Sequence, residues 1–177
     1  ESDEQRKKIA ADLEFLLITR KFGVITDTAV ETLRDVARSE AGEYLMRLLT
    51  AQRSIVRRHA REALLPLVRA EHVERLLELS ETGDRGVQRA CLILLGHAPL
   101  TPDISARLMR GLGQESELAI VAADALAEQG TPIVAELNSV LTRPAVGRSF
   151  GYASYALAKI EREKVRRPLF EESMREP

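Results

Sequence analysis

A nine-residue pattern of mostly apolar and small side chains recurs along the chain at a step of 31 residues. These side chains stand at the first, fifth, eighth and ninth positions of each copy, a spacing that places them on one face of an α-helix. The fifth position is Ala29, Ala60, Cys91, Ala122 and Ala153, and the ninth is Leu33, Leu64, Leu95, Leu126 and Leu157. The pattern therefore predicts five buried helices with a common packing face.

Each step of 31 residues also leaves room for a second helix and two tight turns. Thr101-Pro102 and Thr131-Pro132 both have the form of a helix N-cap followed by proline at the first helical position. The first helices of the pairs are predicted near 3–20, 42–51, 70–81, 101–112 and 131–142. The buried second helices are predicted near 27–39, 54–69, 85–97, 116–129 and 147–163.

Polar residues and glycines mark the turns between these helices. Asp84 and Ser116 stand where they can cap the helices that follow them. Gly83, Gly113 and Gly130 stand where helices are expected to stop, in the left-handed conformation that glycine tolerates. The sequence shows no pattern typical of a strand.

Helix pairs of this length cannot bury their apolar faces alone, whereas stacked pairs form a continuous core. The sequence therefore predicts an all-α fold, a right-handed α-solenoid of about five two-helix repeats. The array is expected over residues 1–163, with repeats near 1–40, 41–69, 70–98, 99–129 and 130–163. Residues 164–177 break the repeat and are expected to form a charged C-terminal tail with one short helix at most.

These repeats resemble HEAT repeats, in particular the short bacterial HEAT-like type also seen in phycobilin lyases. In that type the second helix often begins Asp-x-x-Val-Arg and continues with Ala and Ala-Leu. Here Asp84-Arg-Gly-Val87 keeps the Asp and Val, with Gln88 in place of Arg. Val56-Arg57 keeps the Val-Arg pair, with Arg53 in place of Asp. The resemblance implies a scaffold or regulatory module that serves other macromolecules.

Composition narrows the possible partners. The formal net charge is −1, aromatic residues make up 4% of the chain and Trp is absent, which argues against nucleic acid as a partner. No apolar run reaches the roughly 18 residues of a membrane span, so no direct membrane insertion is expected and the location is predicted to be cytoplasmic. Cys91 is the single cysteine, which excludes an internal disulfide. The start at Glu1 leaves open a processed form or a domain of a larger protein, including a membrane-bound one.

Signals for catalysis are weak. The segment from Gly147 to Gly151 matches the G-x-S-x-G nucleophile elbow around Ser149, but a helix is predicted there instead of the strand that the motif needs. No His follows His97 and no Asp follows Asp124, so the other two members of a triad are missing in their usual order. The histidines show no metal-ligand spacing. We therefore predict no catalytic, cofactor-binding or metal-binding residues and no enzymatic activity.

Arginines form the first candidate partner-binding surface. Six arginines lie between residues 47 and 69, against one acid, Glu62. Arg57, Arg58 and Arg61 fall on one flank of the buried face of their helix, and Arg89 continues the Arg58 row in the next repeat. Guanidinium groups bind carboxylates and phosphates in a bidentate manner, which favours an acidic protein surface or a phosphate group as ligand. The alternative is a solvated face whose charges are neutralised by the neighbouring glutamates Glu71, Glu74, Glu78 and Glu81.

Tyr152 and Tyr155, together with Lys159, form the second candidate surface on the last predicted helix. Two tyrosines in a chain this poor in aromatic residues are typical of an interface anchor. They are equally consistent with a cover over the end of the array.

The function predicted from these observations is a non-enzymatic scaffold or regulatory module that binds a protein partner through the concave surface of its second helices. A nucleic-acid-binding protein, as in the HEAT-like alkyl-base glycosylases, is one alternative. An auxiliary lyase or regulatory domain of a larger protein is another.

Overall fold

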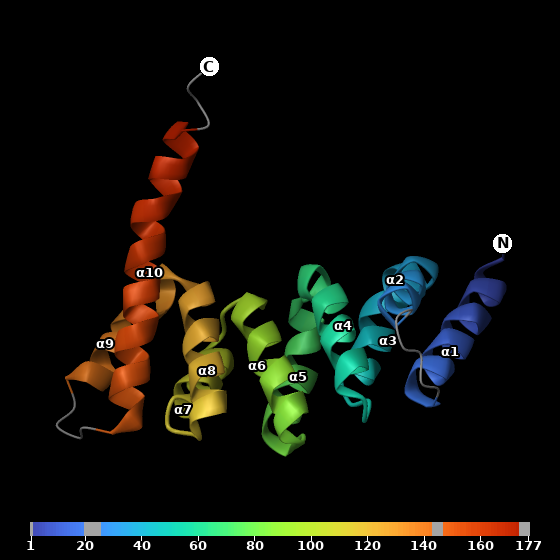
Figure 1. Cartoon of the computed structure of the whole chain (residues 1–177), viewed down its shortest axis with the longest axis horizontal. Helices are drawn as coiled ribbons and strands as arrows, with labels where there is room; N and C mark the ends of the chain where they lie inside the picture. Colours follow the sequence, from blue (N-terminus) through green and yellow to red (C-terminus); the bar gives the residue numbers. More distant parts are fainter. Residues whose placement is uncertain (1, 20–25, 143–146, 174–177) are drawn as a thin grey trace. The chain divides into compact units, whose positions relative to one another are not determined.

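The computed structural model describes residues 2–19, 26–142 and 147–173, and within these ranges the protein is all-helical with no strand (Figure 1). The chain forms two compact units, residues 1–94 and 95–177, and the division falls inside helix α6 (Arg85–His97).

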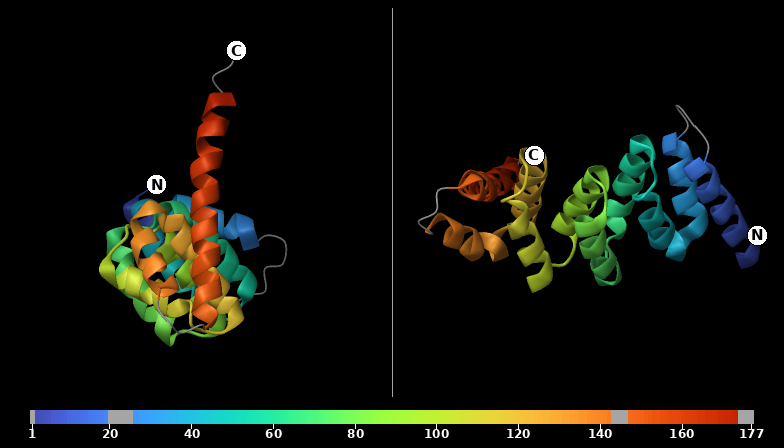
Figure 2. Two further views of the ribbon diagram at one scale, coloured as in Figure 1. Left: turned by 90° about the vertical axis from the view of Figure 1, so that its left-hand side faces the viewer. Right: turned by 90° about the horizontal axis from the view of Figure 1, so that it is seen from below.

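The first unit contains helices α1 to α5 and most of α6. Their bounds are Asp3–Thr19 for α1, Thr26–Ala37 for α2, Ala41–Leu48 for α3, Ser54–Leu64 for α4 and Ala70–Thr82 for α5. Short 3₁₀ turns, Arg38–Glu40 and Leu65–Leu67, precede α3 and follow α4. Helix α1 packs against α2 and α3, and both α2 and α3 pack against α4, as the right-hand view of Figure 2 shows. From α1 to α4, helices that follow one another in the chain are therefore neighbours in space.

The second unit contains the end of α6 and helices α7 to α10. Their bounds are Pro102–Gly111 for α7, Ser116–Gln129 for α8, Val134–Leu141 for α9 and Arg148–Ser173 for α10. A 3₁₀ turn, Thr131–Ile133, leads into α9. Helix α8 packs against α7 on one side and α10 on the other, and α10 also packs against α9. Helix α8 is therefore the central helix of this unit, which agrees with the burial of seven of its residues.

The two predicted rows of the repeat form much of the core of both units. The fully buried members are Leu33, Leu64, Leu95 and Leu126 from one row and Ala60, Cys91, Ala122 and Ala153 from the other. Ala29 is only half-buried, because Val30 takes the buried position in α2. Leu157 is also half-buried, since it lies on α10, the last helix described.

Two predicted helix caps are confirmed. The Thr101 hydroxyl oxygen accepts a hydrogen bond of 3.3 Å from the backbone N–H of Ile104, at the start of α7. The Asp84 carboxylate accepts one of 2.9 Å from the backbone N–H of Val87, at the start of α6. The cap predicted for Ser116 is wrong, because this residue is already the first helical residue of α8.

The left-handed conformation predicted for three glycines holds only at Gly130, where φ is 70°. Gly83 follows α5 with φ −71°, and Gly113 has no positive φ either. Gly83 is constrained by space instead. A Cβ there would lie 2.7 Å from the carbonyl oxygen of Leu79 and 2.7 Å from the Val87 side chain. The turn from α5 into α6 is therefore too tight for a side chain at this position.

The predicted end of the last helix at residue 163 is wrong, because α10 continues to Ser173. The segment after 163 was expected to leave the helix as a tail. Around the predicted end the sequence is rich in Glu, Arg and Lys, which favour helix, and Lys164 pairs with Glu161 one turn earlier at 2.5 Å. Local propensity therefore extends the helix beyond the repeat.

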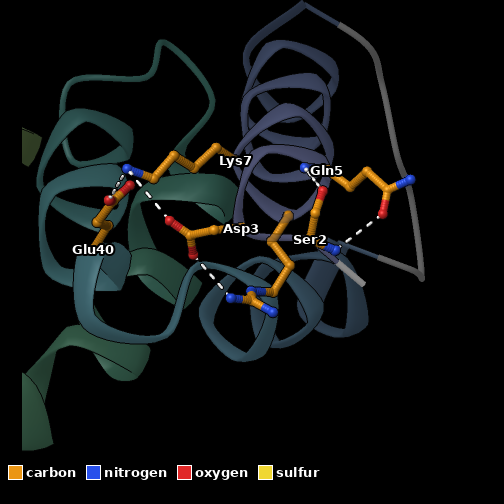
Figure 3. A network of polar contacts seen from close by, with 6 residues as sticks. Ser2, Asp3, Gln5, Lys7 and Glu40 are labelled. Atoms are coloured by element: carbon orange, nitrogen blue, oxygen red, sulfur yellow. Dashed lines mark hydrogen bonds and ion pairs between the residues drawn. The ribbon is translucent and has the colours of Figure 1, made fainter.

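Charged groups hold α1 to the turn between α2 and α3, as Figure 3 shows. Lys7 lies 2.7 Å from the Glu40 carboxylate and 3.9 Å from that of Asp3. The hydrogen bond to Glu40 raises the pKa of Lys7. Arg38, the first residue of the 3₁₀ turn after α2, adopts φ 48°, a left-handed conformation that is uncommon outside glycine. This residue turns the chain toward α3 and places Glu40 opposite α1.

No single helix in the described ranges is both long and apolar enough to span a bilayer. In the described ranges, only α8 taken together with the segment 131–141 is long and apolar enough, and these two helices are bent by 114° relative to each other.

Candidate arginine-lined binding site

The structure brings the four predicted arginines together around one hollow in the first unit. This hollow, which we call the arginine hollow, has a volume of about 340 Å³. It is formed by α4 and the start of α6 and is lined by Ser54, Ile55, Arg57, Arg58, Arg61, Gly86, Arg89 and Ala90. None of these lining residues is acidic, so the surface of the hollow is strongly cationic.

Arg57 contributes to the fold as well as to the charge of the hollow. Its Nη1 donates hydrogen bonds to the backbone carbonyls of Ala51 at 2.6 Å and Gln52 at 2.9 Å. The same atom lies 4.0 Å from the Asp84 carboxylate. Arg57 therefore ties the loop before α4 to the start of α6, and only part of its guanidinium is available to a ligand.

Arg58 and Arg61 are less fully engaged. Arg58 is exposed, and its one hydrogen-bond contact in the described structure is with the His59 ring at 3.4 Å. Arg61 donates from Nη2 to the Glu62 carboxylate at 3.1 Å. The Nε of Arg61 is buried and has no hydrogen-bond partner among the described residues. Both side chains therefore retain donor groups that the protein does not satisfy.

The alternative to a binding site was a surface neutralised by the glutamates of α5. Two of them are engaged along their own helix: Glu78 pairs with Arg75, and Glu71 lies 3.8 Å from the His72 ring. Asp84 approaches Arg57, and Glu62 pairs with Arg61. Both are largely exposed, at 64% and 49% of the side chain, so water screens these pairs.

Two helix N-termini also border the hollow. Ser54 and Ile55 belong to the first turn of α4, and Gly86 belongs to the first turn of α6. Helix α4 has no side-chain cap, since Arg53 stands at the N-cap position without a capping hydrogen bond. In the described structure the backbone N–H groups of Ile55 and Gly86 have no hydrogen-bond acceptor. Sequence analysis missed this feature, although Arg53 at an N-cap position, where Ser, Thr, Asp or Asn is usual, was a visible signal.

The tyrosine surface lies in the second unit and is partly used within it. The Tyr155 hydroxyl donates a 3.0 Å hydrogen bond to Asp124 on α8, which raises the pKa of Tyr155. Lys159 lies 2.9 Å from the same carboxylate and 3.3 Å from Glu128. Burial lowers the pKa of Lys159, but these two carboxylates outweigh it and the net change is upward. Tyr155 and Lys159 thus bind α10 to α8, while Tyr152 is half-buried.

The remaining sequence signals do not assemble into a catalytic site. Ser149 lies in the first turn of α10 with no strand before it in the described chain. It borders a second hollow of about 760 Å³, together with Ser105 and Glu136, which are hydrogen-bonded to each other; no histidine lines that hollow. Cys91 is buried in the core. No group of three or more His, Cys, Asp or Glu suited to a metal ion occurs in the described part of the chain.

Comparisons with known proteins do not assign the chain to a family. No protein-family model matches the chain, and no curated protein matches it. The crystal structure of an engineered protein, a target of the Northeast Structural Genomics Consortium, is similar over 91% of this chain and 85% of that chain. The sequence identity is 22% and the TM-score is 0.47. This likeness is too weak to support a statement about fold or function.

Proposed function

We propose that the protein is a non-enzymatic helical-repeat module that binds an acidic protein partner through the arginine hollow. The single observation that supports this most strongly is the convergence of Arg58, Arg61 and Arg89 on one open hollow without a lining carboxylate. Guanidinium groups are suited to carboxylate-rich surfaces because each presents a planar fork of donors.

The finer architecture is part of the same proposal. The helix pairs are HEAT-like repeats in a right-handed α-solenoid, and the four arginines belong to the second helices of two successive repeats. The equivalence of positions 58 and 89 in the 31-residue repeat supports this, because both line the arginine hollow. A module of this kind acts by presenting side chains from rigid helices, so it needs no catalytic group.

The test is affinity capture from an extract of the source cells, using the purified chain as bait. Arg58→Glu combined with Arg89→Glu reverses two charges at the hollow and removes no known core contact. We expect this variant to lose the captured partner and to keep the helicity measured by circular dichroism.

Arg34→Glu combined with Arg75→Glu is the matched control. Both of these arginines lie in the first unit outside the hollow; Arg34 is half-buried and pairs with Asp35, and Arg75 is exposed and pairs with Glu78. The control variant makes the same change in net charge and should capture the same partner as the unmodified chain. Equal capture by all three proteins would contradict the proposal.

A gel-shift experiment distinguishes a nucleic-acid partner from a protein partner. A protein–DNA or protein–RNA complex held by phosphate contacts weakens steeply with salt. A retarded band at low ionic strength that disappears with added salt and with Arg58→Glu would favour nucleic acid over a protein partner. The net charge of −1 leads us to expect no such band.

A further inference from the structure

We propose that the arginine hollow recognises a phosphorylated side chain of the partner; this rests on the proposed function and specifies its ligand. A phosphorylated Ser, Thr or Tyr carries a charge of about −1.5 to −2 at pH 7 and three strong acceptor oxygens. The hollow offers donors of a number and arrangement that suit such a group.

The donors surround the hollow from two helices. Helix α4 supplies the Ser54 hydroxyl and the unpartnered N–H of Ile55 in its first turn, and the guanidinium groups of Arg58 and Arg61 further along. Helix α6 supplies the unpartnered N–H of Gly86 and the guanidinium of Arg89. A planar carboxylate fills one fork of donors, whereas a tetrahedral phosphoryl group can accept from several directions at once.

The two helix N-termini add to this preference. Helices α4 and α6 have 11 and 13 residues, and the first turn of each borders the hollow. The positive end of a helix dipole and its unbonded N–H groups favour an anion at that place. The absence of a side-chain cap on α4 leaves those groups open to a ligand.

Two of the arginines, Arg58 and Arg61, retain donor groups that the protein does not satisfy. Arg58 contacts only the His59 ring, and the buried Nε of Arg61 has no acceptor among the described residues. All four arginines line one small volume, so an anion bound there would be attracted by several guanidinium groups at once. The volume of about 340 Å³ is at the lower end of the range of about 300–1,000 Å³ typical of ligand sites, which suits one modified side chain better than an extended strand.

The space for this arrangement depends on Gly86. A Cβ at this position would lie 2.6 Å from Nη2 of Arg57, so a side chain here would displace that guanidinium. Glycine therefore lets Arg57 pass over the start of α6 and leaves the Gly86 N–H accessible from the hollow.

The experiment measures fluorescence anisotropy with three short labelled Gly/Ser peptides that differ only at the centre: phosphoserine, serine or glutamate. We expect the phosphoserine peptide to bind about tenfold more tightly than the glutamate peptide, and the serine peptide to bind least. Arg58→Gln combined with Arg89→Gln should weaken phosphoserine binding by about tenfold or more. Arg34→Gln combined with Arg75→Gln should leave it unchanged.

A second measurement does not depend on any variant. In amide NMR spectra of the unmodified chain, inorganic phosphate and the phosphoserine peptide should each shift the Gly86 and Ile55 resonances. No shift with either probe overturns the inference. The glutamate and phosphoserine peptides could instead bind equally well, and both could lose binding in the Arg58→Gln, Arg89→Gln variant. That result would overturn phosphoryl recognition and would still support binding of an acidic partner. Tighter binding of a single-stranded oligonucleotide of equal charge, through the same arginines, overturns both.

Discussion

Arg57 occupies the space in which a side chain at position 86 would begin. A Cβ built on Gly86 would lie 2.6 Å from Nη2 of Arg57, while Nη1 of the same guanidinium bonds the carbonyls of Ala51 and Gln52. The two residues belong to successive repeats of the sequence. Their contact couples the loop before α4 to the first turn of α6 and defines one wall of the arginine hollow.

This relationship predicts a non-additive pair of substitutions. Gly86→Ala should destabilise the protein by about 1 kcal/mol, because it displaces a guanidinium that makes two charge-assisted hydrogen bonds. In an Arg57→Ala background the same substitution should be neutral or stabilising by up to about 1 kcal/mol, since alanine favours helix over glycine. Urea denaturation of the four proteins gives the coupling free energy. Additive effects would show that the two residues do not interact in solution.

Arg57 and Arg58 are adjacent in sequence and should differ in their effect on stability. Arg57→Ala should lower the free energy of unfolding by about 1–3 kcal/mol, because Arg57 bonds two backbone carbonyls. Arg58→Ala should change it by no more than about 0.5 kcal/mol, as is usual for an exposed side chain. Thermal or urea unfolding of the two variants measures this difference. Similar losses for both would mean that Arg57 is not an anchor of the loop.

Gln129 provides a side-chain cap for the end of α6. Its Nε2 donates hydrogen bonds to the carbonyls of Leu95, Gly96 and Ala98 at 2.9, 3.0 and 3.0 Å. Gln129→Ala leaves these helix-end carbonyls without that donor and should cost about 1–2 kcal/mol of stability. Gln52→Ala, at an exposed position, is the matched control and should be near neutral. The free energy of unfolding in urea distinguishes them, and equal values would argue against the cap.

Leucines at equivalent positions of the repeat should differ in how much they contribute to the stability of the protein. Leu95 is fully buried, and Leu95→Ala should destabilise by about 2–5 kcal/mol because it opens a cavity. Leu157 occupies the equivalent position of the repeat on α10 but is half-buried, so Leu157→Ala should cost distinctly less. Calorimetric unfolding of the two variants checks the order. A negligible effect of Leu95→Ala would contradict its place in the core.

The hydrogen bond from Tyr155 to Asp124 predicts that this tyrosine ionises at a higher pH than a free tyrosine. Its pKa is raised above the ordinary value near 10, so spectrophotometric titration should show a tyrosine that deprotonates above pH 10. Asp124→Asn should lower that step, and Tyr155→Phe should remove it. Because the folded-state pKa is raised, this contact stabilises the fold below pH 10 and is lost as the pH rises through the folded-state value. An unchanged titration in Asp124→Asn would exclude the contact in solution.

Periodicity was enough to place the helices and most of the core. The five predicted second helices begin within one residue of the observed ones, and four of the five row leucines are fully buried. This succeeds because a side chain that recurs on one helix face can be buried only on that face. Predictions of helix ends were less successful. Gly83 was predicted to end a helix in the left-handed conformation, but glycine is needed there because Leu79 and Val87 leave no room for a Cβ. Ser116 was predicted to be an N-cap, but it is already the first residue of α8.

The sequence by itself determined the helical fold, its core rows and the fact that four arginines fall on neighbouring helical faces, because these depend on residue spacing within a helix. Only the tertiary structure decided what each arginine does. Arg57 turns to the backbone of a preceding loop, whereas Arg58 remains exposed beside the uncapped start of α4. That difference depends on which carbonyls and helix ends other segments bring within hydrogen-bonding distance, and residue spacing along one helix contains no information about them.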